Sequence, residues 1–319
     1  MRERMLVAVL VAAVALAAAT GVFAGNGKPI NDGSANSLTL AVIGDVPYGS
    51  AQLAEFPEWV AAINDEPKGD LVVHLGDIKS GSTRCDDAYY ATIAGLFASF
   101  KDPLVYTPGD NEWTDCHRVN NGSYDPLERL ATLRETFFAD PGLTLGGRKK
   151  HVLAQAGYPE NVLWMQSQAV FAAVHVVGSN NSLDPWTGNA APTPAQLAEA
   201  EARIAAAVRW IDAAFDTADG EGAAGVVLMM QADTFEGANE TLAGFAAILD
   251  RIEARAARFE RPVLLLQGDS HSYLQDNPLA GAPNLTRVVV EGSATASEWL
   301  KLTVDPRAPD VFSWERVAL

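Results

Sequence analysis

The sequence predicts an α/β protein built around a parallel β-sheet. Short apolar runs alternate with stretches of helical periodicity along the first third of the chain, which is the pattern of β-α-β units whose strands are buried on both faces. The chain has 319 residues, of which 48% are hydrophobic, so it can bury a large core as one large domain or two small ones.

Three apolar runs open the predicted fold, and each is ended by a Gly-Asp pair. They are residues 38–43, 71–75 and 104–107. Helical patterns at 51–64 and 87–100 lie between them, so the strands should be parallel and joined by right-handed crossovers. Ligands of such sheets bind at the carboxyl ends of the strands. The aspartates that end these strands are therefore candidate site residues.

The second half of the chain continues with strands and helices in alternation. We expect helices at 126–139, 194–215 and 243–258, a hairpin of 162–166 with 169–177, and strands at 225–230, 262–267, 285–291 and 299–304. The chain contains no repeat at the spacing of solenoid proteins and no low-complexity linker. We therefore expect a single domain at residues 37–319.

The N-terminus has the composition of a secretory signal peptide. Basic residues precede an alanine-rich apolar run at 6–19, and the chain then reads Val22-Phe23-Ala24, which suits cleavage after Ala24. The run is short and weakly apolar for an uncleaved membrane anchor. We expect residues 1–24 to be removed, residues 25–36 to be a flexible lead-in, and the mature chain to be secreted or periplasmic, without a membrane span.

The charge and the cysteines narrow the possible partners. A formal net charge of −17 repels phosphate backbones, so we expect no binding to duplex nucleic acid. The two cysteines, Cys85 and Cys116, predict one disulfide in an exported chain. Both fall in loops that leave the same edge of the predicted sheet, where a disulfide would hold the rim of the site.

Four Gly-Asp pairs end predicted strands, and the fourth follows residues 262–267. Their aspartates are Asp45, Asp77, Asp110 and Asp269. Any one pair is explained by turn formation and helix capping. Four carboxylates that converge at one edge repel each other unless cations neutralise them, so the set favours a metal site.

These residues resemble the calcineurin-like metallophosphoesterases, whose motifs are Asp-x-His, Gly-Asp-x-x-Asp, Gly-Asn-His-Asp/Glu, a lone His and Gly-His-x-His. Asp45 matches the first motif and Asp77 the bridging aspartate of the second, while residues 109–112 and 268–271 match the third and the last. The resemblance implies a four-layer αββα sandwich. It also implies a metal-dependent phosphoester hydrolase that acts on a small-molecule substrate through a metal-activated water.

The chain departs from the family pattern at most of its histidines. Pro47 stands in place of the histidine of the first motif, and Ser80 in place of the second aspartate of the second motif. Gln231 stands near the position where the family has its lone histidine. The resemblance then implies the metal ligands Asp45, Asp77, Asp110, Gln231, Asp269 and His271. Oxygen ligands suit Mn²⁺ or Mg²⁺, and also Ca²⁺. One ion or two are compatible with this set, and Asp77 would bridge a pair.

The family's proton donor for the leaving group has no direct counterpart in this sequence. Asn111 stands in place of the catalytic histidine and cannot act as a general acid. Glu112 and His117 are the nearby candidates, and Arg118 is a candidate phosphate ligand. His117 is equally compatible with a surface loop. Tyr48, Trp113 and Trp186 are candidate walls for a substrate, and His74 is expected to be a buried, hydrogen-bonded core residue.

Two other hypotheses for the function of this chain remain. The loss of histidines favours a catalytically degenerate relative that binds metal or phosphate-bearing ligands without turnover. Residues 268–270 also read Gly-Asp-Ser, as in the nucleophile block of SGNH hydrolases. That block opens the SGNH fold, whereas here it stands near the end of the chain with no Asp-x-x-His after it, so this reading is disfavoured.

Overall fold

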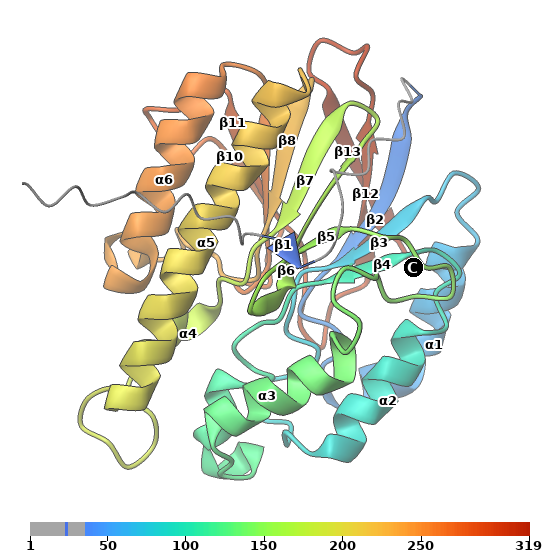
Figure 1. The fold of residues 1–319 in the computed structure, drawn as a ribbon. Helices are drawn as coiled ribbons and strands as arrows, with labels where there is room; N and C mark the ends of the chain where they lie inside the picture. The colour runs from blue at the N-terminus through green and yellow to red at the C-terminus, as the bar shows by residue number, and fades with distance from the viewer. Residues whose placement is uncertain (1–22, 25–35) are drawn as a thin grey trace, which may run out of the picture.

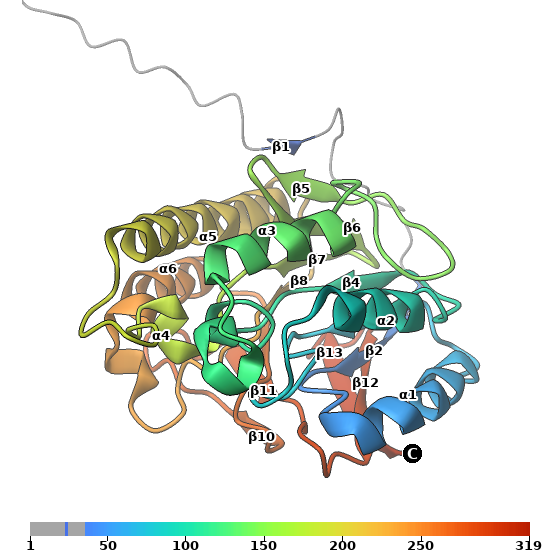
Figure 2. The ribbon, with the colours of Figure 1, turned by 90° about the horizontal axis from the view of Figure 1, so that it is seen from below.

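The computed structural model describes residues 23–24 and 36–319. Two β-sheets pack face to face, and helices cover the outer face of each (Figure 1). α5 (Pro194–Gly220) and α6 (Ala243–Phe259) cover the larger sheet, while α1 (Gly49–Asn64) and α2 (Asp87–Phe97) cover the smaller one, as Figure 2 also shows. The predicted αββα sandwich is confirmed.

The smaller sheet contains the β-α-β-α-β unit that the sequence predicts. Its strand order is β13-β12-β2-β3-β4, and its strands are β2 (Leu38–Ile43), β3 (Leu71–His74), β4 (Leu104–Tyr106), β12 (Glu298–Val304) and β13 (Phe312–Ala318). β2, β3 and β4 are parallel. β12 pairs antiparallel with β2, so the end of the chain completes the sheet that its beginning forms.

The larger sheet has the order β1-β5-β6-β7-β8-β9-β11-β10. Its strands are β1 (Phe23–Ala24), β5 (Leu153–Gln155), β6 (Tyr158–Gln166), β7 (Ala169–Ala173), β8 (Gly225–Met229), β9 (Val263–Gln267), β10 (Leu274–Asp276) and β11 (Leu285–Val289). β6 and β7 form the predicted hairpin. β7, β8, β9 and β11 are parallel neighbours, so both sheets direct the carboxyl ends of parallel strands toward loops that carry polar residues.

Alternating side chains of the central strands serve two different cores. In β2, Leu40 and Val42 pack between the sheets, whereas Ala41 and Ile43 pack under α1 and α2. In β8 the residues that face α5 and α6 likewise alternate with those that face the other sheet. Because both faces are buried, these strands are continuous apolar runs rather than alternating ones.

Several elements differ from the sequence expectation. α5 extends five residues beyond the predicted end, and it begins with a capping box in which Thr193 and Gln196 bond each other's backbone N–H groups. β5, β10 and β13 were not predicted, because they are short or, in β13, carry polar residues along an exposed edge. The remaining elements are α3 (Pro126–Phe137), α4 (Gly178–Ser182) and the 3₁₀ turns Thr114–His117, Val119–Asn121 and Asn239–Thr241.

The predicted signal peptide and lead-in lie outside the described residues, apart from β1 and Asn36. β1 pairs antiparallel with β5 at the edge of the larger sheet. Within the part of the chain that the structure describes, no helix combines the length and apolar character needed to cross a bilayer.

Candidate metal centre

The four Gly-Asp pairs meet at one edge of the sandwich, although they come from distant parts of the chain. The backbone N–H of Asp45 donates to the carbonyl of Gly76 (2.9 Å), and that of Asp269 donates to both carboxylate oxygens of Asp45 (3.1 and 3.0 Å). Asp77, Asp110 and Asp269 each offer a carboxylate oxygen, and these three oxygens lie within 4.8 Å of one another. The structure therefore brings all four aspartates together.

The backbone at these strand ends is held in unusual conformations. Asp45 (φ 54°), Asp77 (φ 54°), Asp269 (φ 72°) and His271 (φ 63°) all lie in the left-handed region, which non-glycine residues rarely adopt. Glycine is required at Gly109, because a Cβ atom there would lie 2.0 Å from Asp77 Oδ1. Strain of this kind is stored at functional sites, where the surrounding structure over-determines it.

The cluster is electrostatically unfavourable in the absence of a cation. Burial raises the pKa of Asp77 well above its usual value, and the charges of Asp110 and Glu112 raise it further. Burial also raises the pKa values of Asp45 and Asp269, and Asp110 adds to both shifts. A divalent ion among these carboxylates would reverse the effect of their mutual repulsion.

Lys79 places a buried positive charge beside the cluster. Lys79 is fully buried, and its ammonium donates to Asn121 Oδ1 (3.0 Å) and to the carbonyl of Ser80 (3.1 Å). Burial lowers its pKa to about 8, while Glu112 and Asp77 act in the opposite direction. Lys79 follows Asp77 by two residues, in the loop where the family has its second aspartate.

Tyr48 lies among the carboxylates, not along an apolar wall. Its hydroxyl donates to Asp77 Oδ2 (2.9 Å) and accepts from Asn111 Nδ2 (2.9 Å). It also lies 3.5 Å from Asp45 Oδ1 and 3.3 Å from His271 Nε2. The sequence interpretation of this side chain as a wall was wrong, because the loop after Asp45 turns the phenol inward.

Asn111 and Glu112 both hold other site residues in place. Asn111 donates to Asp77 through its backbone N–H (3.1 Å) and through Nδ2 (2.7 Å). Glu112 is fully buried, and its Oε1 accepts from the backbone N–H of Gly109 (2.6 Å) and Asp77 (3.1 Å) and from the hydroxyl of Tyr106 (2.8 Å). Glu112 thus ties the loops after β3 and β4 together.

Gln231 follows β8 and is also fully buried. Its Oε1 accepts the backbone N–H of Gly178 (2.8 Å), and, against the larger effect of burial, its side-chain amide lowers the pKa of Asp269. An amide oxygen has two lone pairs, so Gln231 can ligate a metal through the one that Gly178 does not use.

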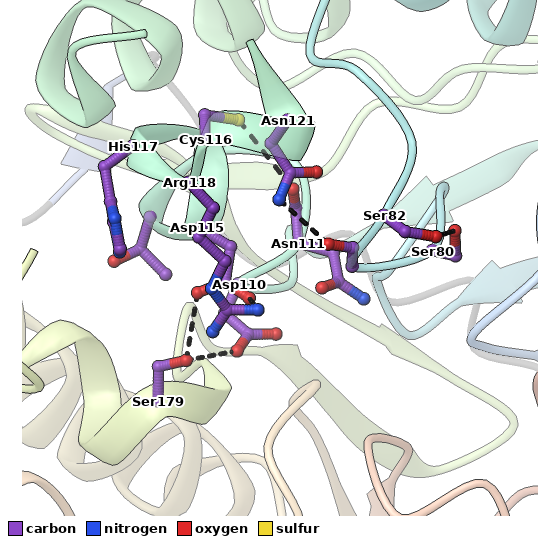
Figure 3. Close-up of polar contacts among 12 residues, drawn as sticks. Ser80, Ser82, Asp110, Asn111, Asp115, Cys116, His117, Arg118, Asn121 and Ser179 are labelled. Carbon is purple, nitrogen blue, oxygen red and sulfur yellow. Dashed lines mark hydrogen bonds and ion pairs between the residues drawn. The ribbon is translucent and has the colours of Figure 1, made fainter. Parts of the chain in front are cut away.

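A residue that the sequence did not indicate, Ser179, also reaches the cluster. Its hydroxyl donates to Asp110 Oδ2 (2.7 Å) and lies 3.2 Å from Asp115 Oδ1, as Figure 3 shows. Ser179 lies in α4, where residues 179–182 are all in the left-handed region. Such a turn costs roughly 1–2 kcal/mol per residue. Side chains of α5 compensate: Arg203 and Gln196 donate to carbonyls of the turn.

His117 and Arg118 lie at the rim. His117 Nδ1 accepts the backbone N–H of Thr187 (2.9 Å), and with Trp186 the ring lines a surface groove of about 470 Å³. Arg118 is paired with the buried Asp115 (2.6 Å) and is 42% exposed. Burial, followed by the charge of Asp110, raises the pKa of Asp115 to about 7, and Arg118 opposes the shift. Of the expected walls, Trp186 lines this groove.

Trp113, another expected wall, is fully buried and packs against His175 in the interior.

The predicted disulfide is confirmed, since Cys85 and Cys116 are bonded with Cα atoms 5.9 Å apart. It joins the loop after β3 to the 3₁₀ turn after β4. His74 is also buried as predicted: Nε2 donates to the Val46 carbonyl (2.8 Å), and Nδ1 accepts the N–H of Gly76 (3.2 Å).

Comparison with solved structures gives three distant similarities. The chain is similar to GAP50, the anchor in the inner membrane complex of Plasmodium, with a TM-score of 0.47, 10% identity, and 89% of each chain covered. Purple acid phosphatase PPD1 from seeds of yellow lupin (Lupinus luteus) has a TM-score of 0.45 and 13% identity, with 90% of this chain and 54% of the phosphatase covered. The sulfate thiohydrolase SoxB of Thermus thermophilus has a TM-score of 0.43 and 15% identity, with 92% of this chain and 58% of SoxB covered.

These similarities are too low to support an assignment, and no curated protein matches the chain in sequence. The family model of the calcineurin-like phosphoesterases matches residues 38–210, which is more than half of the chain and includes the loops of Asp45, Asp77 and Asp110. Together with the two packed sheets and the aspartates at their strand ends, this match identifies the chain as a member of the calcineurin-like phosphoesterase family.

Proposed function

We propose that this chain hydrolyses a small-molecule phosphoester with the help of a divalent cation held by Asp77, Asp110 and Asp269. The observation that supports this best is the approach of the three carboxylate oxygens to within 4.8 Å of one another, in a member of a phosphoesterase family. Three anionic oxygens at this separation are a ligand set for one hard cation.

The residues around this cluster fit an ion. The donor set consists of oxygens, which favours Mn²⁺ or Mg²⁺ and also admits Ca²⁺. Gly178 leaves room for the two carboxylates that face it, since a Cβ atom there would lie 2.7 Å from Asp110 Oδ2 and 3.0 Å from Asp269 Oδ2. When bound, the ion supplies Lewis acidity toward phosphoryl oxygen and water.

The surrounding side chains suggest separate roles in the reaction. Arg118 is a partly exposed cation that pairs with Asp115 at the rim of the cluster, and its guanidinium suits two phosphoryl oxygens at once. His117 is the proposed proton donor for the leaving group, because Glu112 is sealed in the interior and Asn111 cannot act as an acid. Asn111 and Ser179 orient two of the carboxylates.

The direct test is turnover of an aryl phosphate monoester and diester by chelator-treated protein with Mn²⁺, Mg²⁺ or Ca²⁺ restored. We expect activity that requires added metal and that Asp269→Asn abolishes, whereas Asp102→Asn, a carboxylate paired with Arg148, retains it. Activity that is indifferent to chelation contradicts the proposal. Metal binding without turnover supports the alternative of a degenerate relative, which the amide of Asn111 beside Asp77 favours.

We also propose that the protein acts outside the cytoplasm, as one domain at residues 37–319 after loss of residues 1–24. The Cys85–Cys116 disulfide supports this proposal, because such bonds persist in oxidising compartments. N-terminal sequencing of the mature protein from its host tests it. An N-terminus that follows Ala24 is expected, and an intact Met1 contradicts it.

A further inference from the structure

The hydroxyl of Tyr48 lies between three potential metal ligands. It is 2.9 Å from Asp77 Oδ2, 3.5 Å from Asp45 Oδ1 and 3.3 Å from His271 Nε2. If Asp77 bridged a pair of ions, with one among Asp77, Asp110 and Asp269, Asp45 and His271 would be the expected ligands that remain beside Asp77 for the second ion. In this chain the centre of that second set is filled by a protein oxygen.

Two of the three residues, Asp45 and Asp77, also accept hydrogen bonds from protein donors. Both carboxylate oxygens of Asp45 accept the backbone N–H of Asp269. Asp77 Oδ2 accepts from Tyr48 and also from Asn111 Nδ2 (2.7 Å). Tyr48 and Asn111 together take up both lone pairs of Asp77 Oδ2, so that only removal of the phenol frees one of them for a cation, whereas the bond from Asp269 takes one lone pair on each oxygen of Asp45.

The remaining position of this second set is also lost. Pro47, which stands where the family motif has a histidine, offers no side-chain donor atom. Its carbonyl lies 3.4 Å from the hydroxyl of Tyr89. The set therefore lacks a ligand and has a hydroxyl at its centre.

The phenol is fixed in this position. Tyr48 is buried, and its ring packs edge to face on that of His271, with centroids 5.3 Å apart. Its backbone N–H donates to Gln52 Oε1, and Gln52 in turn donates to the carbonyl of Ser293 (3.0 Å). An incoming ion would have to displace a side chain that is held from both ends.

Lys79 adds a fixed positive charge beside the acidic cluster. Its buried ammonium is held by Asn121 and the carbonyl of Ser80, and its charge acts on Glu112 and Asp77. A fixed ammonium beside an acidic cluster offsets part of the repulsion that a second divalent ion would otherwise neutralise.

We infer that the chain binds a single ion, among Asp77, Asp110 and Asp269, and that the Tyr48 hydroxyl takes the place of a second one. The inference rests on the proposed function only in using that ion site. It makes the centre mononuclear, so that Asp77 is a terminal ligand and not a bridge.

The test is the number of ions bound per chain, measured by inductively coupled plasma mass spectrometry after equilibration with Mn²⁺ and by isothermal titration calorimetry. We expect about one ion per wild-type chain and about two for Tyr48→Ala, since removing the phenol frees Asp45, Asp77 and His271 for an ion. Tyr89→Ala is the matched control. Its hydroxyl donates to the carbonyl of Ile78 (2.9 Å) and not to a carboxylate, so it should keep the wild-type count.

The possible outcomes separate this inference from the proposed function. Two ions in the wild type overturn the inference but leave a metal-dependent hydrolase. No bound ion overturns both. A folded Tyr48→Ala that still binds one ion overturns the role given to the hydroxyl, and if this variant does not fold, the wild-type count alone decides whether the centre is mononuclear.

Discussion

Replacing Asp77 by asparagine should abolish metal binding while leaving the fold intact. Asp77 is buried, with Oδ1 accepting from the backbone of Asn111 and Oδ2 from Tyr48 and Asn111. Asparagine has the same shape and retains one of the two acceptor oxygens. The NH₂ group of the new side chain replaces the other oxygen and faces an N–H group of Asn111. This contact loses about one hydrogen bond, which costs roughly 1 kcal/mol.

The same change relieves repulsion in the metal-free protein. Two ionised carboxylates separated by 4.8 Å, the upper limit within this cluster, repel by about 3.5 kcal/mol at an effective dielectric constant of about 20. The relief is smaller than this where the carboxyl groups are protonated, but it opposes the lost hydrogen bond. The melting temperature of the metal-free variant should therefore equal or exceed that of the wild type.

Thermal shift with Mn²⁺ measures the loss of binding. At about 100 times its dissociation constant, an ion that binds only the folded state stabilises it by about 2.7 kcal/mol, or roughly 5 °C for a chain of this size. If the variant binds at least ~100-fold more weakly, the same concentration gives at most about 0.4 kcal/mol, or under ~1 °C. Turnover of an aryl phosphate should disappear with the shift.

Asp102→Asn is the control, because Asp102 is also buried but pairs with Arg148 outside the cluster. It should keep the full thermal shift even if it lowers stability. An Asp77→Asn protein with wild-type activity and the full Mn²⁺-induced shift would refute the role of Asp77 as a ligand.

Three further changes test other parts of the account. Ser179→Ala should raise the Mn²⁺ dissociation constant roughly 10- to 100-fold with little change in the metal-free melting temperature. Ser182→Ala removes a hydroxyl that contacts Thr114 and should leave the dissociation constant unchanged. Equal dissociation constants for the two variants would contradict the orienting role of Ser179. Burial lowers the pKa of His74 to about 4, so between pH 6.5 and 4 the unfolded chain binds a proton that the folded chain does not. The free energy of unfolding should therefore fall by roughly 3 kcal/mol over this range, and urea titrations of His74→Gln should lack this part of the fall. Replacing Cys85 and Cys116 together by serine should lower the free energy of unfolding by about 3–4 kcal/mol, because their loop spans 31 residues; unchanged urea unfolding would count against it.

The positions of the site aspartates could be predicted because they depend on local signals. An apolar run that stops at Gly-Asp marks both the end of a buried strand and the residue that follows it, and parallel strands bring their carboxyl ends to one edge. Asp45, Asp77 and Asp110 follow consecutive parallel strands of one sheet. Asp269 follows β9 of the other sheet, and the packing of the two sheets brings it to the same edge.

The contacts of the other side chains depend on backbone conformations that the sequence does not indicate. Left-handed φ values occur at Asp45 and at Ser179, and they are too uncommon in non-glycine residues to be predicted from residue type. The first precedes the turn that directs Tyr48 inward, and the second directs a hydroxyl to Asp110. Glu112 was predicted as a catalytic candidate from its place in the motif. Its burial under the loops after β3 and β4 depends on tertiary packing and could not be predicted locally.

The most direct test of a metal centre formed by three aspartates is the anomalous scattering of Mn²⁺ in crystals of the wild-type protein. The account predicts one strong peak at coordination distance, about 2.0 to 2.6 Å, from carboxylate oxygens of Asp77, Asp110 and Asp269. A peak at another location, or none at Mn²⁺ concentrations that produce the thermal shift in solution, would contradict it.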